Sequence, residues 1–228
     1  MLKSVLNKFA MNEKVTSDMI MGDIIRLHPE VVDTLISQGM HCLGCPSSQQ
    51  ESLIDELIRY ASSQGWSDSD LVDKYGSKDR RKLDEVIDES NIHGWLQSRI
   101  HDAEGRYAAL VLDVAGDQED RLTALKQAAY DFGASQHLNA TTAPEAFHRL
   151  DDLLLDGMPC DQVNRVRESD DSRITWDRTM DLHSEFWQGH GDRYYALRQA
   201  LVDGLLSATD YAFTSPAEGQ YEIVKKSA

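Results

Sequence analysis

Apolar residues recur at intervals of three and four along most of the chain, a pattern typical of amphipathic helices. Within the first 76 residues, this pattern predicts four short helices separated by loops of a few residues, over about residues 17–27, 29–39, 49–63 and 70–75. Ser48 and Glu51 have the spacing of a capping box for the third helix, and Gly65 follows its expected end. Four such helices would form a small orthogonal bundle.

A charged, polar segment at residues 77–82 has the composition of a linker. We therefore expect a helical domain at 1–76, which contains the C-x-x-C pair, and a second domain at 83–228. The second domain opens with helical periodicity over about residues 82–114, 118–134 and 143–156. Thr142 and Glu145 form a capping box for the last of these helices.

Further along, the period changes from helical to alternating. Residues 163–168 and 174–180 alternate around the polar turn at 169–172, which predicts a hairpin. After another helical pattern over 192–208, residues 211–214 and 221–224 predict a second hairpin. The expected fold class is mostly α with an α+β C-terminal domain, in which the helical bundle is followed by helices and a small antiparallel sheet.

The chain is strongly acidic, with 23 basic and 39 acidic residues and a formal charge of −16. An acidic surface repels phosphate backbones and anionic lipid headgroups, so we expect neither a nucleic acid nor a membrane as a partner. No apolar run approaches the roughly 20 residues of a membrane-spanning helix, and the first ten residues lack the apolar core of a signal peptide. These features favour a cytoplasmic protein.

Two of the three cysteines, Cys42 and Cys45, form a C-x-x-C pair between the second and third predicted helices. Such a pair can close a small disulfide ring or hold one side of a soft metal ion. The predicted helix after Cys45 would stabilise a thiolate through its N-terminal dipole. In a reducing cytosol this spacing is typical of catalytic, redox-sensing or metal-binding cysteines, although two buried, inert thiols remain an alternative.

Metal binding would need more ligands than the pair supplies. His41 precedes Cys42 and can act as a ligand or donate to a thiolate, and Cys160 is the third thiol. Cys42 and Cys45, together with His41, Cys160 or a second subunit, would complete a zinc or iron–sulfur site. Cys160 can equally be a resolving thiol or a buried core residue.

The cysteine segment resembles a known family, the hybrid-cluster-protein-associated redox disulfide domain, over about residues 13–76. The matching residues are Lys14–Met19, Gly22–Ile25, His28–Glu30, Gly39–Pro46 and Glu51–Leu53. The resemblance implies a compact helical domain with its cysteine pair on a loop between helices, redox-active or metal-binding. Both family cysteines map onto Cys42 and Cys45.

In the C-terminal part, a fainter resemblance rests on the order of His183, Trp187, Tyr195, Gly204 and the predicted strand Tyr221–Lys226. These residues resemble domains related to aminothiazoline-carboxylate hydrolases. The G-D-x-x-C element associated with that group is absent, so no catalytic residue is carried over. The resemblance implies a hydrolase-like enzyme with its pocket in the second domain.

Two weaker clusters lie in the second domain. Glu145 and His148 form an E-x-x-H pair, which we interpret as a capping glutamate and a half-buried histidine, because a di-iron site needs a second such motif. Asp181, His183 and Glu185 would share one face of an extended segment, where they could bind a divalent cation or act as a general base.

The leading hypothesis is a thiol/disulfide accessory protein in which Cys42 and Cys45 serve a partner protein or redox enzyme, with Cys45 as the attacking thiolate. The alternatives are a metal-binding or iron–sulfur assembly module and a small-molecule enzyme. The protein can also be a homo-oligomer or a subunit of a larger complex.

Overall fold

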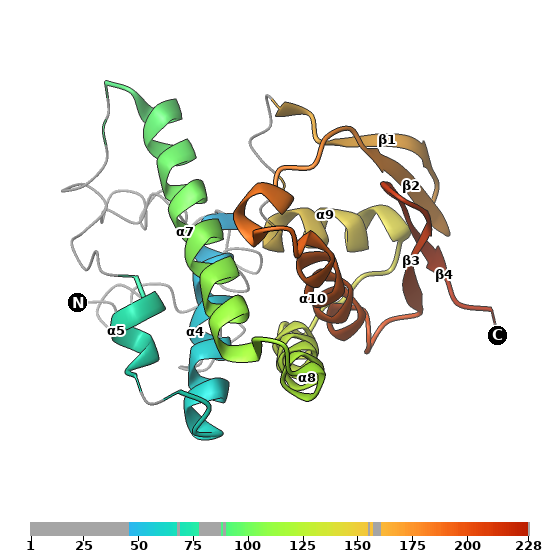
Figure 1. Ribbon diagram of the computed structural model, residues 1–228. Coiled ribbons are helices and arrows are strands. Elements are labelled where there is room, and N and C mark those ends of the chain that lie inside the picture. Colours follow the sequence, from blue (N-terminus) through green and yellow to red (C-terminus); the bar gives the residue numbers. More distant parts are fainter. Residues whose placement is uncertain are drawn as a thin grey trace, which may run out of the picture. The chain divides into compact units, whose positions relative to one another are not determined.

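The computed structural model describes residues 46–67, 69–77, 88, 90–154, 156 and 161–227 (Figure 1). These residues belong to one compact unit, which comprises Pro46–Arg80 and Asp88–Ala228. The two helices predicted before residue 40 and most of the expected linker lie outside the described residues.

In the described part, helices dominate and a small antiparallel sheet occupies the C-terminal region, which confirms the expected fold class. The α-helices are α4 (Pro46–Ser63), α5 (Leu71–Tyr75), α7 (Ile92–Ala115), α8 (Glu119–Ser135), α9 (Ala143–Leu153) and α10 (Gly191–Leu205), and η3 (Ser184–Trp187) is a short 3₁₀ helix. The strands are β1 (Asn164–Ser169), β2 (Arg173–Arg178), β3 (Tyr211–Ala217) and β4 (Gln220–Lys225). They pair in the order β1-β2-β4-β3.

Helix starts differ from the prediction at two places. Helix α4 begins at Pro46, so Ser48 lies inside the helix and is not its N-cap. Proline suits a first helical turn because its missing N–H would have no helical partner there. Helix α7 begins only at Ile92, where the side chain of Asn91 accepts a hydrogen bond from the backbone N–H of Gly94.

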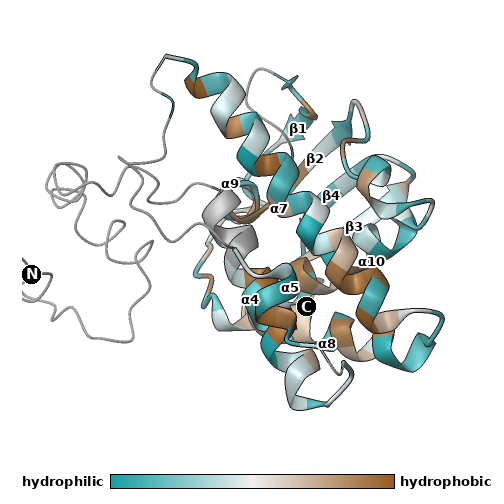
Figure 2. Ribbon diagram, turned by 60° about the vertical axis from the view of Figure 1, so that its left-hand side comes forward, coloured by the Kyte–Doolittle hydropathy of each residue, from teal (hydrophilic) through white to brown (hydrophobic). Residues whose placement is uncertain are grey.

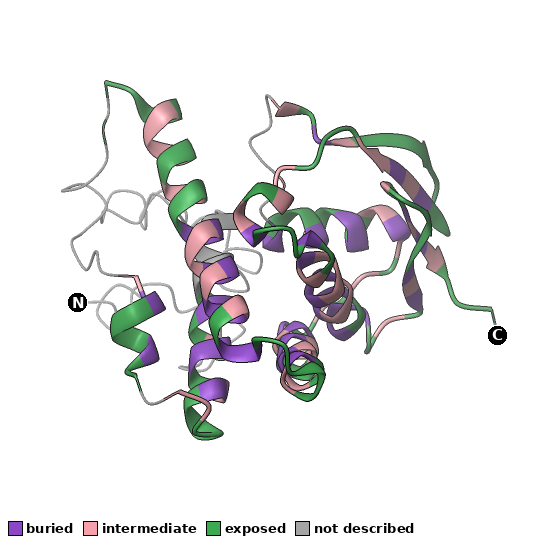
Figure 3. Ribbon diagram, viewed as in Figure 1, coloured by how far each residue is buried: buried purple, intermediate pink, exposed green. Residues whose placement is uncertain are grey.

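The core of the unit is continuous from α4 to the sheet. One face of α4 is fully enclosed and contributes Leu53, Ile54, Leu57, Ile58 and Ala61. This face packs against α7, α8 and α9, and α5 is tied to α7 by the Tyr75 hydroxyl, which donates to Asp113 at 2.7 Å. Figure 3 shows the buried positions gathered where these helices meet. Residues 46–76, expected to belong to a separate N-terminal domain, therefore share their core with the C-terminal elements.

Helices α8 and α10 approach closely because each presents a glycine to the other. A Cβ added at Gly133 would overlap the backbone of Leu201, and one added at Gly204 would overlap the backbone of Tyr130. Only the absence of a side chain allows this approach. The close packing fixes α10, which carries much of the site described below.

Both predicted hairpins are present, and α9 and α10 contact the sheet (Figure 1). Side chains along β2, β3 and β4 alternate between the core and the outside. The buried ones are Ile174, Trp176, Tyr211, Phe213, Tyr221 and Ile223. Trp176 pairs with Tyr221 across β2 and β4, and Ile174 pairs with Ile223. The turn between β3 and β4 is shorter than expected, with Gly219 at a φ of +69°.

Apolar positions lie mainly on the packed sides of the helices, and polar positions on their outer sides (Figure 2). None of the described helices is long and apolar enough to cross a membrane.

Candidate functional site

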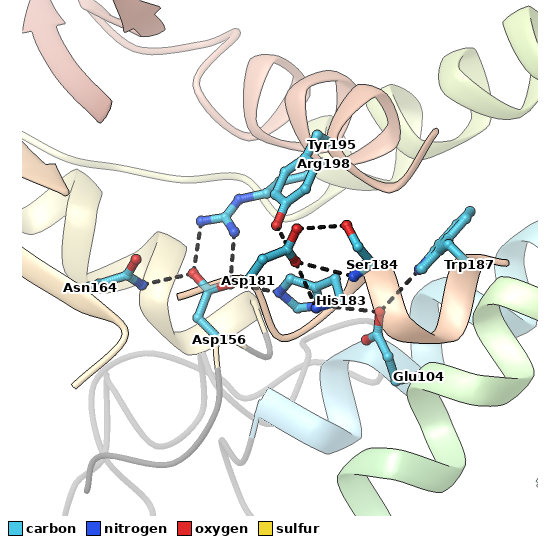
Figure 4. Close-up of polar contacts among 9 residues, drawn as sticks. All are labelled: Glu104, Asp156, Asn164, Asp181, His183, Ser184, Trp187, Tyr195 and Arg198. Carbon is cyan, nitrogen blue, oxygen red and sulfur yellow. Dashed lines mark hydrogen bonds and ion pairs between the residues drawn. The ribbon is translucent and has the colours of Figure 1, made fainter. Parts of the chain in front are cut away.

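Four charged or titratable side chains meet in the interior, each from a different part of the fold (Figure 4). Glu104 comes from α7, Asp156 follows α9, His183 immediately precedes η3, and Arg198 lies on α10. The exposed fractions of Glu104, His183 and Arg198 are only 2%, 2% and 3%. Charged residues are rarely buried so completely unless they are paired.

His183 bridges the two carboxylates of this buried ion network. Its Nδ1 lies 3.1 Å from Oε1 of Glu104, and its Nε2 lies 3.2 Å from Oδ1 of Asp156. An ionised carboxylate only accepts hydrogen bonds, so both ring nitrogens must donate. The geometry therefore favours the imidazolium form of His183.

Asp156 is the most heavily bonded member of the network. Arg198 donates to its two oxygens through Nη1 and Nη2, both at 2.7 Å, in a bidentate pair. The side-chain amide of Asn164 donates to Oδ2, also at 2.7 Å. With Glu104 and Asp156 ionised and His183 and Arg198 protonated, the four charges balance.

The pKa shifts of His183 and Asp156 agree with this balance. Burial disfavours the imidazolium of His183, but its hydrogen bonds to Asp156 and Glu104 outweigh burial and raise its pKa above the ordinary value. Burial also disfavours the carboxylate of Asp156, yet the charge of Arg198 and the hydrogen bond from His183 hold its pKa well below the usual range.

Aromatic rings enclose the network. The ring of Tyr194 stacks on His183 with centroids 3.8 Å apart, and the indole N–H of Trp187 donates to Oε1 of Glu104 at 3.3 Å. Tyr107 packs edge-on against Trp187. These contacts exclude water and hold the imidazole in one orientation.

Asp181 organises the turn that leads into η3. Its carboxylate accepts hydrogen bonds from the backbone N–H groups of His183 and Ser184, from the Ser184 hydroxyl at 2.6 Å and from the Tyr195 hydroxyl at 2.8 Å. Partial burial opposes ionisation, but these hydrogen bonds outweigh it and lower the pKa of Asp181.

This turn contradicts the extended segment expected for residues 181–185. Because the chain bends at Asp181, His183 enters the core while Glu185 stays exposed on η3. The three side chains therefore do not share one face. Among the described residues, no group of three or more histidine, cysteine, aspartate or glutamate side chains is arranged to hold a metal ion.

A pocket of about 380 Å³ opens beside the network. It is bounded by the turn after Asp181, by the first half of α10 and by the adjoining ends of β2, β3 and β4. Arg178, Arg198 and Tyr195 are among its lining residues, and so are the aromatic side chains of Phe213 and Tyr221. The guanidinium of Arg178 lies 4.3 Å from the centre of the Tyr195 ring.

The predicted cysteine site belongs to the part of the chain outside the described residues. His41, Cys42, Cys45 and Cys160 all lie outside the described residues. In the described part, Glu145 completes the predicted capping box with Thr142, as expected, and His148 is exposed rather than half-buried.

The prediction from sequence missed Glu104, Asp156, Arg178 and Arg198. A signal existed for two of them, because Glu104 and Arg198 lie on helix faces that are otherwise apolar. A charged residue in such a stripe indicates a buried partner. The local sequence gives no comparable signal for Asp156 or Arg178.

The described fold and site define a helical unit with a small antiparallel sheet, a buried ion network and an adjacent pocket. Residues 15–55 match the sequence profile of a family described as a domain of unknown function (DUF1858). The match includes Cys42 and Cys45 and extends into α4. No curated protein and no solved structure matches the chain.

Proposed function

We propose that the protein is a thiol/disulfide redox accessory protein that acts on a partner protein or redox enzyme through Cys42 and Cys45. The observation that carries the proposal is the position of the pair in the sequence. Both cysteines fall within the family match, and α4, an 18-residue helix, begins at the residue after Cys45. A thiolate that precedes a helix of this length is favoured by the helix dipole.

In the proposed reaction, the thiolate of Cys45 attacks a disulfide of the partner and forms a mixed disulfide, releasing one partner thiolate. The thiolate of Cys42 then attacks the sulfur of Cys45, which forms the Cys42–Cys45 disulfide and releases the second partner thiolate. Two electrons pass to the partner, whose disulfide becomes two thiols.

Reaction with 5,5′-dithiobis(2-nitrobenzoate), a small aromatic disulfide, tests the assignment of Cys45. The Cys42→Ser variant should keep a fast-reacting thiol and accumulate the mixed disulfide, because no second thiol resolves it. The Cys45→Ser variant should lose the fast phase, whereas Cys160→Ser, the control, should behave as the parent protein. A fast phase that survives in Cys45→Ser would contradict the assignment.

Metal binding by the same residues is the first alternative. Cys42, Cys45, His41 and Cys160 supply the donor types of a zinc site, and the cysteines those of an iron–sulfur cluster. Thiolates bound to a metal would not form a disulfide, so metal content separates the two proposals.

The pocket favours a second candidate function, a small-molecule enzyme whose site lies in the C-terminal part. Its volume lies within the range of about 300 to 1,000 Å³ that small-molecule sites occupy. Its lining combines the aromatic side chains of Tyr195, Phe213 and Tyr221 with charged and polar groups that could orient a bound molecule. Saturable binding of a small molecule at this pocket would support this candidate.

A further inference from the structure

Arg178 has a partly buried side chain and no carboxylate partner among the described residues. Arg198 is held by Asp156, Arg173 by Glu222 and Arg167 by Asp177. In the part of the chain that the structure describes, no carboxylate lies within ion-pair distance of Arg178. Its Nη1 is enclosed and has no hydrogen-bond partner there.

The backbone and the ring of Tyr195 hold Arg178 in place. Its backbone N–H donates to the carbonyl oxygen of Gly219 at 2.7 Å, which fixes the end of β2. Its guanidinium lies over Tyr195, whose hydroxyl is in turn held by Asp181. A guanidinium stacked on an aromatic ring keeps its N–H edge available for a planar anion.

The acidic groups around the pocket do not neutralise Arg178. Asp181 is occupied by the hydrogen bonds of its own turn, as described above. Asp192 and Glu218 also line the pocket, but both are exposed to solvent. These two carboxylates repel a phosphate monoester, which carries nearly two charges, more strongly than they repel an anion with a single charge.

The remaining walls suit a flat apolar body. Phe213 and Tyr221 stack with centroids 5.7 Å apart, and Trp176 stacks behind Phe213 at 5.9 Å. Because these rings come from three paired strands, they form a rigid aromatic surface beside Arg178.

We propose that this pocket binds a small organic monoanion, whose carboxylate pairs with Arg178 and whose flat apolar body lies against Phe213 and Tyr221. The proposal deepens the second candidate function and does not depend on the cysteine pair. Arg198 also lines the pocket, and its Nε has no hydrogen-bond partner among the described residues. The lining of the pocket therefore includes a second enclosed donor.

The test uses the full chain and three probes of similar shape, titrated by calorimetry and by tyrosine and tryptophan fluorescence. Benzoate should bind saturably, and benzamide, which is neutral, should bind about tenfold more weakly or worse because it lacks the charge that Arg178 recognises. Phenyl phosphate, which carries nearly two charges, should also bind more weakly than benzoate. Equal affinity for benzoate and benzamide would overturn the proposal.

Substitution then assigns the binding to Arg178. The Arg178→Gln variant should lose at least about tenfold in benzoate affinity while its affinity for benzamide stays the same. The matched control is Arg173→Gln at the other end of β2, which is paired with Glu222 and does not line the pocket. Unchanged benzoate affinity in Arg178→Gln, or an equal loss in the control, would overturn the assignment.

The comparison of probes on the parent protein keeps the test decisive even if a variant fails to fold. A Cys42→Ser, Cys45→Ser double variant should bind benzoate as the parent does. Thiol reactivity thus tests the redox proposal, and benzoate affinity tests the binding proposal separately.

Discussion

At the scale of single residues, Asp156 determines whether the buried ion network is balanced. Replacing it with asparagine would leave Arg198 and His183 enclosed without their shared counter-charge. Breaking a buried pair in this way costs about 3–5 kcal/mol of unfolding free energy. We therefore expect Asp156→Asn to lower the urea midpoint strongly.

Asp152→Asn is the matched control. Asp152 is also an aspartate, on the preceding helix α9, but its side chain is 60% exposed, and its Oδ2 lies 3.9 Å from Nη1 of Arg149. Exposed pairs contribute about 0–1 kcal/mol, so this variant should unfold close to the parent. Similar midpoints for the two variants would contradict the assigned role of Asp156.

His183 should make stability depend on pH. Its pKa is raised in the folded protein, so between the unfolded value of about 6.5 and the folded value the native state binds more protons than the unfolded state. The stabilisation is complete below about pH 6.5 and is lost as the pH rises through the folded pKa. Each pKa unit of elevation corresponds to about 1.4 kcal/mol.

Urea unfolding of the parent and of His183→Gln from pH 6 to pH 9 isolates this contribution, because other titrating groups are common to both proteins. The stability advantage of the parent should shrink as the pH rises. A constant or growing advantage would mean that His183 is not held as an imidazolium.

Individual residues of the network were only partly predictable. A glutamate within the apolar stripe of α7 already indicates a buried partner, but the sequence does not say which residue that is. Glu104 and His183 lie 79 positions apart, and their contact depends on how α7 and η3 pack. Arg178 was unpredictable for a different reason, because its significance lies in having no carboxylate partner among the described residues.

At the scale of elements, the glycines between α8 and α10 set how closely the two helices pack. Gly204→Ala or Gly133→Ala should lower the unfolding free energy by about 1–3 kcal/mol or more, because the added methyl group meets backbone that cannot move aside easily. Gly105 on α7 provides the control, since a Cβ there would lie 3.9 Å from its nearest neighbour, Phe186.

Gly105→Ala should stabilise the protein by about 0.4–1 kcal/mol, because alanine restricts the unfolded chain and fits the helix. Chemical unfolding of the three variants should therefore show a loss of unfolding free energy for Gly204→Ala and Gly133→Ala and a gain for Gly105→Ala. A Gly204→Ala protein as stable as the parent would show that the two helices are not in such close contact.

Elements were predictable where the signal was local. The capping box of Thr142 and Glu145 and both hairpins follow from neighbouring residues, and the structure has them as expected. The expectation failed at Asp181, where alternation of polar residues suggested an extended segment. Three hydrogen bonds of that turn are local, from His183 and Ser184 to Asp181, and the hydroxyl of Tyr195, 14 positions away, adds a fourth.

At the scale of the whole molecule, α4 belongs both to the described core and to the segment that matches the family profile. It belongs to the core of the described unit, and the family match that contains the cysteine pair extends into it. The sequence suggested a division at residues 77–82 because that segment is polar. Polarity marks an exposed segment, but it does not report which helices share a core.

The metal content and thiol count of protein purified without oxygen test most directly whether Cys42 and Cys45 form a redox-active pair. The chain has three cysteines, so a Cys42–Cys45 disulfide leaves one titratable thiol after oxidation and three after reduction. A redox-active pair should give metal-free, sulfide-free protein that, once oxidised, gains two thiols on reduction, and a Cys42→Ser, Cys45→Ser variant should show no such gain. Stoichiometric zinc or iron that depends on these two cysteines, or an unchanged thiol count, would contradict it.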